Sequence, residues 1–262
     1  MSSVLAADPT ISKFWCDYWL ANEQKSLDFP WNDSYALSEK ERDTVRASIQ
    51  QFQLGEGSSG KQLLDRGRAY SLEADDPLFL SALTLFVREE QRHSAYLLRF
   101  MQQQEIPAIS HHWVDVVFRR LRRLAGLELS LRVLVTAEII AVPYYRALRG
   151  ATKSPLLASI STRILEDEAG HLRFQSSMLS RLAAGRSALL RALVSRMHKL
   201  FLCGTARVVW MGHRAVFEAA GYSFKTFVEE SISEFAALDR RSLATAEGER
   251  ISNFSWGAGT GL

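Results

Sequence analysis

The sequence predicts an all-α fold, and three observations support this prediction. Apolar residues recur with the period of an α-helix through most of the 262 residues. No stretch alternates with period two for long enough to predict a β-sheet. Prolines are scarce, six in all, and hydrophobic residues make up 47% of the chain, as a well-filled helical core requires.

Capping residues and helix breakers divide the chain into six predicted helices. The first, 38–70, begins with Ser38-Glu39-Lys40-Glu41, the pattern of a capping box. The second begins at Asp75-Asp76-Pro77, with acids at the cap and proline in the first turn, and ends before Pro107. The others are expected at 112–149, which Pro143 should kink, 154–185, 187–220 and 223–246.

These helices predict a bundle with additions at both ends. Residues 1–36 are rich in aromatic side chains, and we expect an arm that packs on the bundle. Residues 37–185 form the expected four-helix bundle, residues 186–250 add further helices, and the Gly-rich tail 251–262 should be loose.

Cysteine content, charge and hydropathy predict the general class of protein. Cys16 and Cys203 are the only cysteines, so neither a disulfide framework nor a zinc ribbon is expected. The formal charge of +3 neither demands nor excludes a nucleic-acid or membrane partner. The N-terminal residues lack a secretory signal pattern, and the longest apolar run, 133–145, is shorter than the ~20 residues of a spanning helix. We therefore expect a soluble cytoplasmic protein without a transmembrane segment.

A run of acid, Glu, two residues and His occurs twice. The copies are Glu89-Glu90-Gln91-Arg92-His93 and Asp167-Glu168-Ala169-Gly170-His171, each inside a predicted helix. Residues three apart share a helix face, so each copy points a carboxylate and an imidazole in the same direction. Two such helices, each facing a helix with one inward Glu, build a two-metal site inside a four-helix bundle.

The preceding helices supply the two further carboxylates. Glu138 interrupts an apolar helix face, where an isolated charge would be very costly. Glu56 holds the matching position before the first motif, whereas its rival Glu73 lies beside a predicted turn and should be solvated. For any single residue the alternative is a hydrogen-bonded polar group in the core. The predicted metal ligands are Glu56, Glu90, His93, Glu138, Glu168 and His171.

This donor set predicts the metals and two supporting residues. Four carboxylates and two imidazoles suit two divalent first-row ions, with iron or manganese favoured over zinc. A metal-bound histidine usually gives its other ring N–H to a carboxylate or carbonyl. We therefore expect Asp167 to orient His93, and Glu89 to orient His171, from across the bundle. The alternative for both acids is a solvated position at the flank of a helix.

The six ligands resemble, in type and order, those of the ferritin-like di-iron carboxylate superfamily. The resemblance covers about residues 40–185 and implies a four-helix bundle with one long crossover, here residues 105–113. It also implies two iron ions, or a mixed manganese–iron pair, and dioxygen or peroxide chemistry. The chain has Ile164 where arylamine N-oxygenases carry an extra His, and it lacks the Cys-rich domain of rubrerythrins. The resemblance therefore assigns no subfamily.

The glycine cluster around Glu56 requires a structural reason. A glycine inside a helix costs about 1 kcal/mol relative to alanine, so this cluster predicts either open volume for dioxygen and substrate or close helix packing. Tyr145 is a candidate relay for an electron or hydrogen atom, with Tyr144 as the rival inward tyrosine and a plain core tyrosine as the alternative. The expected pocket residues are Phe52, Gly60, Phe86, Val142, Tyr145 and Phe174.

Together these features predict an oxygen-activating di-iron enzyme that oxidises a small organic substrate with O₂ as co-substrate. No flavin or nicotinamide fingerprint is present, so an external donor such as a ferredoxin or a reductase would supply electrons. The alternatives are a ferroxidase or peroxidase, and a metal-binding bundle without turnover. The basic run 119–123 could contact an acidic reductase, a membrane surface or tRNA phosphates, but it is read as a solvated helix face, so no nucleic-acid partner is favoured. A homodimer is compatible with the sequence. His198 and His213 are candidates for extra ligands, but they are expected on the helix surface.

Overall fold

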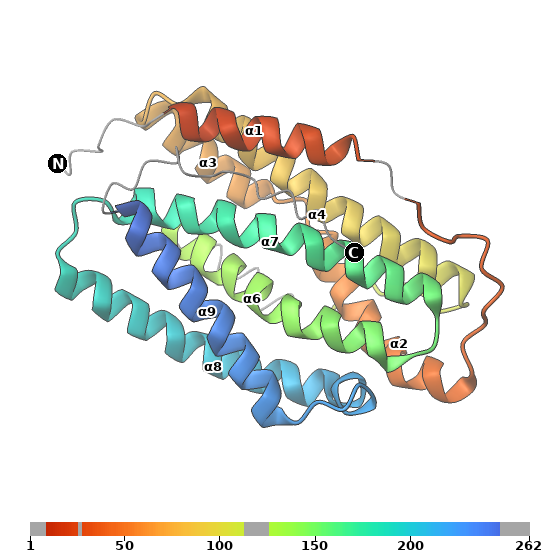
Figure 1. Cartoon of the computed structure of the whole chain (residues 1–262). Helices are drawn as coiled ribbons and strands as arrows, with labels where there is room; N and C mark the ends of the chain where they lie inside the picture. The colour runs from red at the N-terminus through yellow and green to blue at the C-terminus, as the bar shows by residue number, and fades with distance from the viewer. Residues whose placement is uncertain (1–8, 26–27, 113–125, 247–262) are drawn as a thin grey trace, which may run out of the picture.

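The computed structural model describes residues 9–25, 28–112 and 126–246, and all the regular elements in these ranges are α-helices (Figure 1). This finding confirms the all-α fold class. No helix in the described ranges is long and apolar enough to cross a membrane. The helices are α1 (Pro9–Glu23), α2 (Glu39–Glu56), α3 (Lys61–Glu73), α4 (Pro77–Gln103), α6 (Leu127–Ala151), α7 (Pro155–Ala183), α8 (Ala188–Ala219) and α9 (Phe224–Ala246).

Four helices surround the centre of the molecule. Helix α2 packs on α4, α4 on α7, α7 on α6, and α6 on α2, so that their contacts close a ring. Fully buried apolar side chains from all four helices fill its interior, among them Ile49, Leu83, Leu97, Leu131 and Ile160. Side chains on facing helices of such a ring can build a site in its core.

The predicted helix 38–70 is two helices. Its capping box is present, because the Glu41 backbone N–H donates to Ser38 Oγ and the Ser38 backbone N–H donates to Glu41 Oε2. Helix α2 ends at Glu56, and Gly60 follows with a φ of 61°, in the left-handed region that glycine adopts at little cost. The expectation that the glycine cluster lies inside a helix was therefore wrong for Gly57 and Gly60, whereas Gly55 lies in the last turn of α2. The cluster forms the break between α2 and α3.

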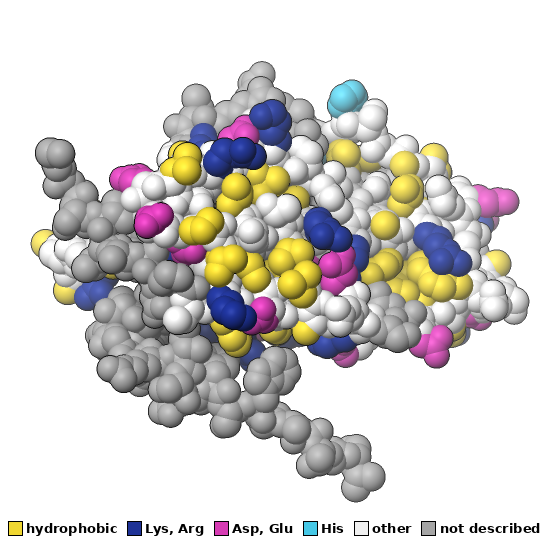
Figure 2. All heavy atoms as spheres, turned by 90° about the horizontal axis from the view of Figure 1, so that it is seen from above, with side chains coloured by type: hydrophobic (Ala, Val, Ile, Leu, Met, Phe, Trp, Pro, Cys, Tyr) yellow, Lys and Arg dark blue, Asp and Glu magenta, His cyan; other side chains and the backbone are white. Residues whose placement is uncertain are grey.

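The N-terminal arm contains a helix that packs on the ring. Helix α1 lies along α4 and buries Trp15 and Trp19. The Trp19 ring centroid is 5.6 Å from that of His171, so α1 covers the central site from one side. On the face seen in Figure 2, the described surface carries apolar side chains interspersed with charges of both signs, in agreement with the mild net charge.

The additional C-terminal helices cover another side of the ring. Helix α8 packs on α2 and α6, and α9 packs on α7, α6 and α8. The expectation that His198 and His213 lie on the helix surface was wrong, because both are buried on the faces of α8 that meet its neighbours. Thr136 Oγ1 lies 3.0 Å from His198 Nε2, and Ser48 Oγ lies 2.8 Å from His213 Nδ1.

Some predictions lie outside the described residues. The helix expected at 112–149 is described from Leu127 onward, and it continues as one helix through Pro143 to Ala151. The basic run 119–123 and the tail 251–262 are outside the described ranges.

Candidate metal centre

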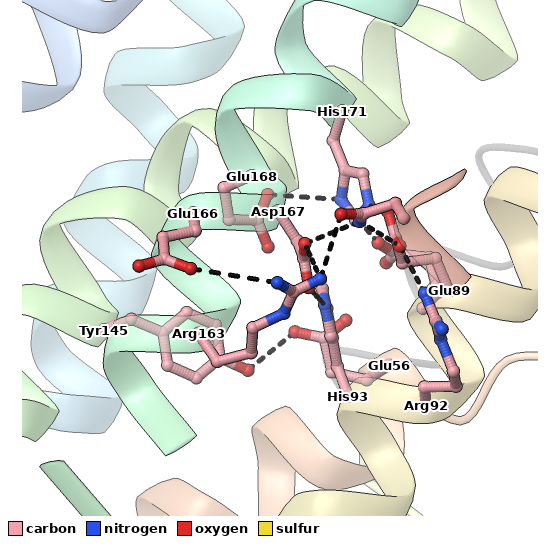
Figure 3. Close-up of polar contacts among 12 residues, drawn as sticks. Glu56, Glu89, Arg92, His93, Tyr145, Arg163, Glu166, Asp167, Glu168 and His171 are labelled. Atoms are coloured by element: carbon pink, nitrogen blue, oxygen red, sulfur yellow. Dashed lines mark hydrogen bonds and ion pairs between the residues drawn. The ribbon is translucent and has the colours of Figure 1, made fainter. Parts of the chain in front are cut away.

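The two acid-Glu-x-x-His motifs meet at the centre of the ring, from the middle of α4 and α7 (Figure 3). One potential ligand atom from each of Glu90, His93, Glu168 and His171 lies within 4.8 Å of those of the others. His93, Glu168 and His171 are fully buried. Because the two residues of each motif are three apart on a helix, they point to the same side and the two pairs form one cluster.

Glu138 of α6 faces the same cluster. Its Oε2 atom lies 3.7 Å from His171 Nδ1, and its Oε1 atom accepts a hydrogen bond of 2.8 Å from Gln175 Nε2. The same imidazole nitrogen lies 2.8 Å from Glu90 Oε1 and 3.5 Å from Glu168 Oε2. Carboxylates from three helices therefore surround one nitrogen, which is a typical arrangement for groups that share a bound cation.

Glu56, the last residue of α2, borders the same interior space. It is buried, its Oε1 atom accepts a hydrogen bond of 2.6 Å from Tyr145 Oη, and it lines a cavity together with Glu90 and Glu138. The rival candidate Glu73 is exposed at the end of α3. The structure thus brings the six predicted ligands together from α2, α4, α6 and α7.

Each imidazole is held by an acid on the facing helix. His93 Nε2 lies 3.1 Å from Asp167 Oδ2, and His171 Nε2 lies 3.2 Å from Glu89 Oε2. The sequence predicted both pairings, and both are present. Since each Nε2 atom is engaged by an acid, the Nδ1 atom is the nitrogen that each ring leaves for the cluster.

Asn22 of α1 links these two acids. Its Nδ2 atom donates to Glu89 Oε1 at 2.6 Å and to Asp167 Oδ1 at 2.8 Å, and its Oδ1 atom accepts from Arg163 at 3.1 Å. Arg163 also forms an ion pair of 2.6 Å with Asp167, and Arg92 forms one with Glu89. Sequence reasoning missed Asn22, because one asparagine in an otherwise unremarkable amphipathic segment gives no signal of its own.

This network keeps the supporting acids ionised. Burial alone would raise the pKa of Asp167, but its hydrogen bonds to His93 and Asn22 and the charge of Arg163 lower it to about 2. Burial is likewise outweighed at Glu89, where the hydrogen bond and the charge of His171 lower the pKa. A carboxylate that stays charged is the better acceptor for an imidazole N–H.

Unpaired buried atoms indicate that the cluster suits a cation. Among the described residues, the buried side-chain atoms without a well-aligned hydrogen bond include Glu90 Oε1, His93 Nδ1, both carboxylate oxygens of Glu168, and His171 Nδ1. The 2.8 Å contact between Glu90 Oε1 and His171 Nδ1 is a close ionic contact without hydrogen-bond alignment. A buried polar atom without a partner is costly, and each of these atoms is a good metal ligand. Glu90, His93, Glu168 and His171 therefore form a group that could hold a metal ion.

The pKa shifts within the cluster also indicate a site that suits a cation. Burial and the charge of Glu90 raise the pKa of Glu56 well above its usual value, and burial and the charge of Glu138 do the same for Glu168. Burial opposes protonation of His171, but the surrounding carboxylates, Glu90 first among them, raise its pKa well above the usual value. Without a metal ion, bound protons neutralise the carboxylates. A metal ion that binds there must displace these protons, so metal binding is linked to proton release.

Tyr145 is the tyrosine that faces the site. Its hydroxyl donates to Glu56, and burial together with the Glu56 charge raises its pKa well above the usual value, so that it stays protonated. Tyr144 turns away: its ring stacks on Phe52 with centroids 3.3 Å apart, and its hydroxyl accepts from Ser48 Oγ at 3.1 Å.

A cavity of about 170 Å³, here called the α8 cavity, opens onto Glu56, Glu90 and Glu138. Its walls come mainly from α2, α6 and α8, and they are mostly apolar. The predicted pocket residue Phe52 lines it, whereas Val142, Tyr145 and Phe174 are buried in the core and are among the lining residues of neither cavity described. The other lining residues are Gln51, Gly55, His112, Val133, Leu134, Ala137, Ile140, Ala141, Thr205, Val209 and His213.

A second cavity, of about 250 Å³, reaches Glu56 and Glu90 from the break between α2 and α3. Its lining includes the predicted pocket residues Gly60 and Phe86 together with polar groups such as Ser58, Ser59, Lys61 and Arg66. Both interpretations of the glycine cluster apply. A side chain at Gly55 would meet nothing within 4 Å, whereas one at Gly60 would meet Val87 at 2.8 Å.

Comparison with known proteins does not identify the chain. No protein-family model, no curated protein and no solved structure gives a significant match. The resemblance to ferritin-like di-iron proteins therefore stays a prediction from the ligand pattern of the sequence.

Proposed function

We propose that this protein is a ferritin-like, non-haem di-iron oxidase or oxygenase that activates dioxygen to oxidise a small organic substrate. One observation carries the proposal: six predicted ligands from four helices converge in the core, and each imidazole is held by the acid of the opposite motif. Glu90, His93, Glu168 and His171 would hold two iron ions, or a manganese–iron pair, with Glu56 and Glu138 completing the site. When bound, these ions supply the electrons that reduce dioxygen.

The supporting acids determine which nitrogen of each imidazole faces the site. Glu89 and Asp167 accept the Nε2–H hydrogens of His171 and His93, so Nδ1 is the ring nitrogen that each histidine directs at the site. Asn22 is bonded to both acids and fixes their separation. The geometry of the ligands is therefore set before any metal binds, which lowers the cost of binding.

Tyr145 holds a proton beside the site. Its Oη–H bonds one oxygen of Glu56, which restrains the carboxylate and leaves the other oxygen for a metal ion. The rings of Phe86 and Trp19 lie against His171, with centroids 4.9 Å and 5.6 Å away, and exclude water from that side. A dry site limits side reactions of reactive oxygen species.

The cavities favour an organic substrate over the two alternatives. Ferroxidase work requires a route for hydrated iron cations, but Lys61 and Arg66 line the second cavity and disfavour their passage. A bundle that only stores metal needs no apolar cavity at its ligands, whereas the α8 cavity adjoins three of them. An external electron donor, such as a ferredoxin or a reductase, completes the proposed reaction.

Metal loading and reaction with oxygen test this proposal. The protein loaded anaerobically with Fe(II) is expected to hold two irons per chain and to give a coloured transient on stopped-flow mixing with O₂. Glu56→Ala and Glu138→Ala should lower the iron content, while Glu73→Ala, a matched change at an exposed glutamate, should not. Two bound irons with slow, colourless oxidation would favour a non-catalytic bundle, and no stoichiometric iron would refute the metal site.

A further inference from the structure

The size and position of the α8 cavity set limits on what it can bind. An apolar protein cavity of about 150 Å³ accommodates benzene, so a cavity of about 170 Å³ takes one ring with a short substituent. Three of the proposed ligands, Glu56, Glu90 and Glu138, form part of its lining. An occupant would therefore lie directly beside the proposed metal site.

The lining of the α8 cavity disfavours an anionic ligand. Among the described residues that line it, none is a lysine or an arginine. A carboxylate or phosphate on the ligand would be desolvated without a cationic partner and would face the acidic side chains of the site. The second cavity differs in this respect, since Lys61 and Arg66 line it.

His213 places one hydrogen-bond acceptor in this apolar lining. Its Nδ1 atom lies 2.8 Å from Ser48 Oγ, and the serine proton is donated to Tyr144 Oη, so Nδ1 carries the imidazole hydrogen. Burial, followed by the charge of His112, lowers the pKa of His213 to about 4, so the ring is neutral at pH 7. The Nε2 atom is then an acceptor, and no hydrogen bond to it is found from the described residues.

The surroundings of His213 hold it in place. The ring contacts Phe52 and Tyr144 edge to face, with centroids 5.2 Å and 5.6 Å away, and only 7% of the residue is exposed. A fixed acceptor in an apolar cavity selects ligands that carry a matching donor, because a ligand without one leaves the acceptor unpaired.

We propose that the α8 cavity binds an uncharged, mainly apolar molecule about the size of one aromatic ring, and that His213 accepts a hydrogen bond from a hydroxyl or N–H group on it. This inference rests on the proposed function, since it identifies the chemical class of the substrate that the metal site would oxidise. Helix α8 lies outside the ring that supplies the metal ligands, so specificity and metal binding come from different parts of the chain.

Binding of three matched probes to the full chain tests the inference. By calorimetry, 2-phenylethanol should bind about tenfold more tightly than ethylbenzene, which lacks the donor, and more tightly than phenylacetate, which is charged. His213→Phe should remove the preference for 2-phenylethanol over ethylbenzene. Equal binding of phenylacetate and 2-phenylethanol, or no binding of any probe, would overturn the proposal.

Variants that fill one cavity at a time locate the binding site. Ala141→Phe and, independently, Ala137→Phe should abolish binding of 2-phenylethanol, whereas Ser59→Phe, which fills the second cavity, should not. Circular dichroism identifies any variant that fails to fold. If one of the two α8-cavity variants is unfolded, the other one tests whether the probe binds in this cavity. Binding that survives a folded Ala141→Phe or Ala137→Phe protein would refute the assigned cavity.

Iron content and probe binding are measured on the same preparation, so the two proposals can fail separately. Probe binding without iron binding supports the ligand class and refutes the di-iron function. Iron binding without probe binding supports the metal site and refutes the ligand class.

Discussion

Replacement of Asp167 by Asn tests whether the acids behind the imidazoles control the metal site. The change removes the charge that accepts the His93 Nε2–H and pairs with Arg163, but it keeps the size of the side chain. Outer partners of metal-bound histidines typically contribute about 10–100-fold to metal affinity. We therefore expect Asp167→Asn to weaken Fe(II) or Mn(II) binding by that factor, or by about 1.4–2.7 kcal/mol.

The same substitution has a predicted effect on stability without metal. The pKa of Asp167 falls from 3.8 to about 2 on folding, and each unit corresponds to about 1.4 kcal/mol, so the charged form contributes about 2 kcal/mol. Because the folded pKa is the lower one, this contribution is present above pH 3.8 and is lost as the pH falls toward 2. At pH 7 the variant should lose most of it in urea unfolding.

Glu166 supplies the matched control. It is adjacent to Asp167, but its side chain is 65% exposed and its contact with Arg163 is 3.8 Å long. Glu166→Gln removes the same charge and should change neither metal affinity nor stability by more than about 0.5 kcal/mol. Competitive metal titration and urea unfolding measure both quantities. If Asp167→Asn and Glu166→Gln behaved alike, the role assigned to the cross-ring pairing would be refuted.

Three further predictions concern the pH dependence of stability, the backbone at Gly60, and the hydrogen bond from Tyr145 to Glu56. Burial, and then the Arg132 charge, lowers the pKa of His198 to about 4, so stability should be full above pH 6.5 and fall by up to about 3 kcal/mol toward pH 4. His198→Gln should remove the His198 contribution to this fall in urea unfolding, while His213, whose pKa is also lowered to about 4, still contributes. Gly60→Ala, at positive φ, should lower the free energy of unfolding by about 1–2 kcal/mol, while Gly55→Ala should not. Tyr145→Phe should leave the fold intact, as judged by circular dichroism, but slow oxygen-dependent iron oxidation, because Glu56 loses its donor. An unchanged oxidation rate would contradict that role.

The sequence predicts the ring and its ligands because both follow from helix periodicity. A carboxylate in the middle of an apolar face, such as Glu138, has few stable environments other than a paired or metal-bound one. The acid that precedes each ligand Glu turns about 100° around the helix from it, so it cannot reach its own histidine's site-facing nitrogen. It reaches the opposite motif instead, and the pairings of Asp167 with His93 and of Glu89 with His171 follow.

Other features depend on contacts that one sequence does not encode locally. The break at Gly60 depends on a backbone angle, and a glycine cluster alone predicts open volume and close packing equally well. His198 and His213 were misassigned although the buried residues of α8 share one helix face, because a histidine on that face is buried only where a neighbouring helix supplies a partner, here Thr136 and Ser48. Asn22 acquires its role only when α1 docks on α4.

The crossed pairings have a consequence for how the site assembles. Each motif supplies a ligand pair, but the acid that orients its imidazole comes from the other motif. Neither half of the site is therefore complete until α4 and α7 are in contact, and Asn22 of α1 bonds both acids at that junction. The polar groups then restrain the relative position of three helices, a restraint that apolar packing alone provides less specifically. Metal binding, which requires both Nδ1 atoms at once, should thus favour the docked arrangement and stabilise the ring as a unit.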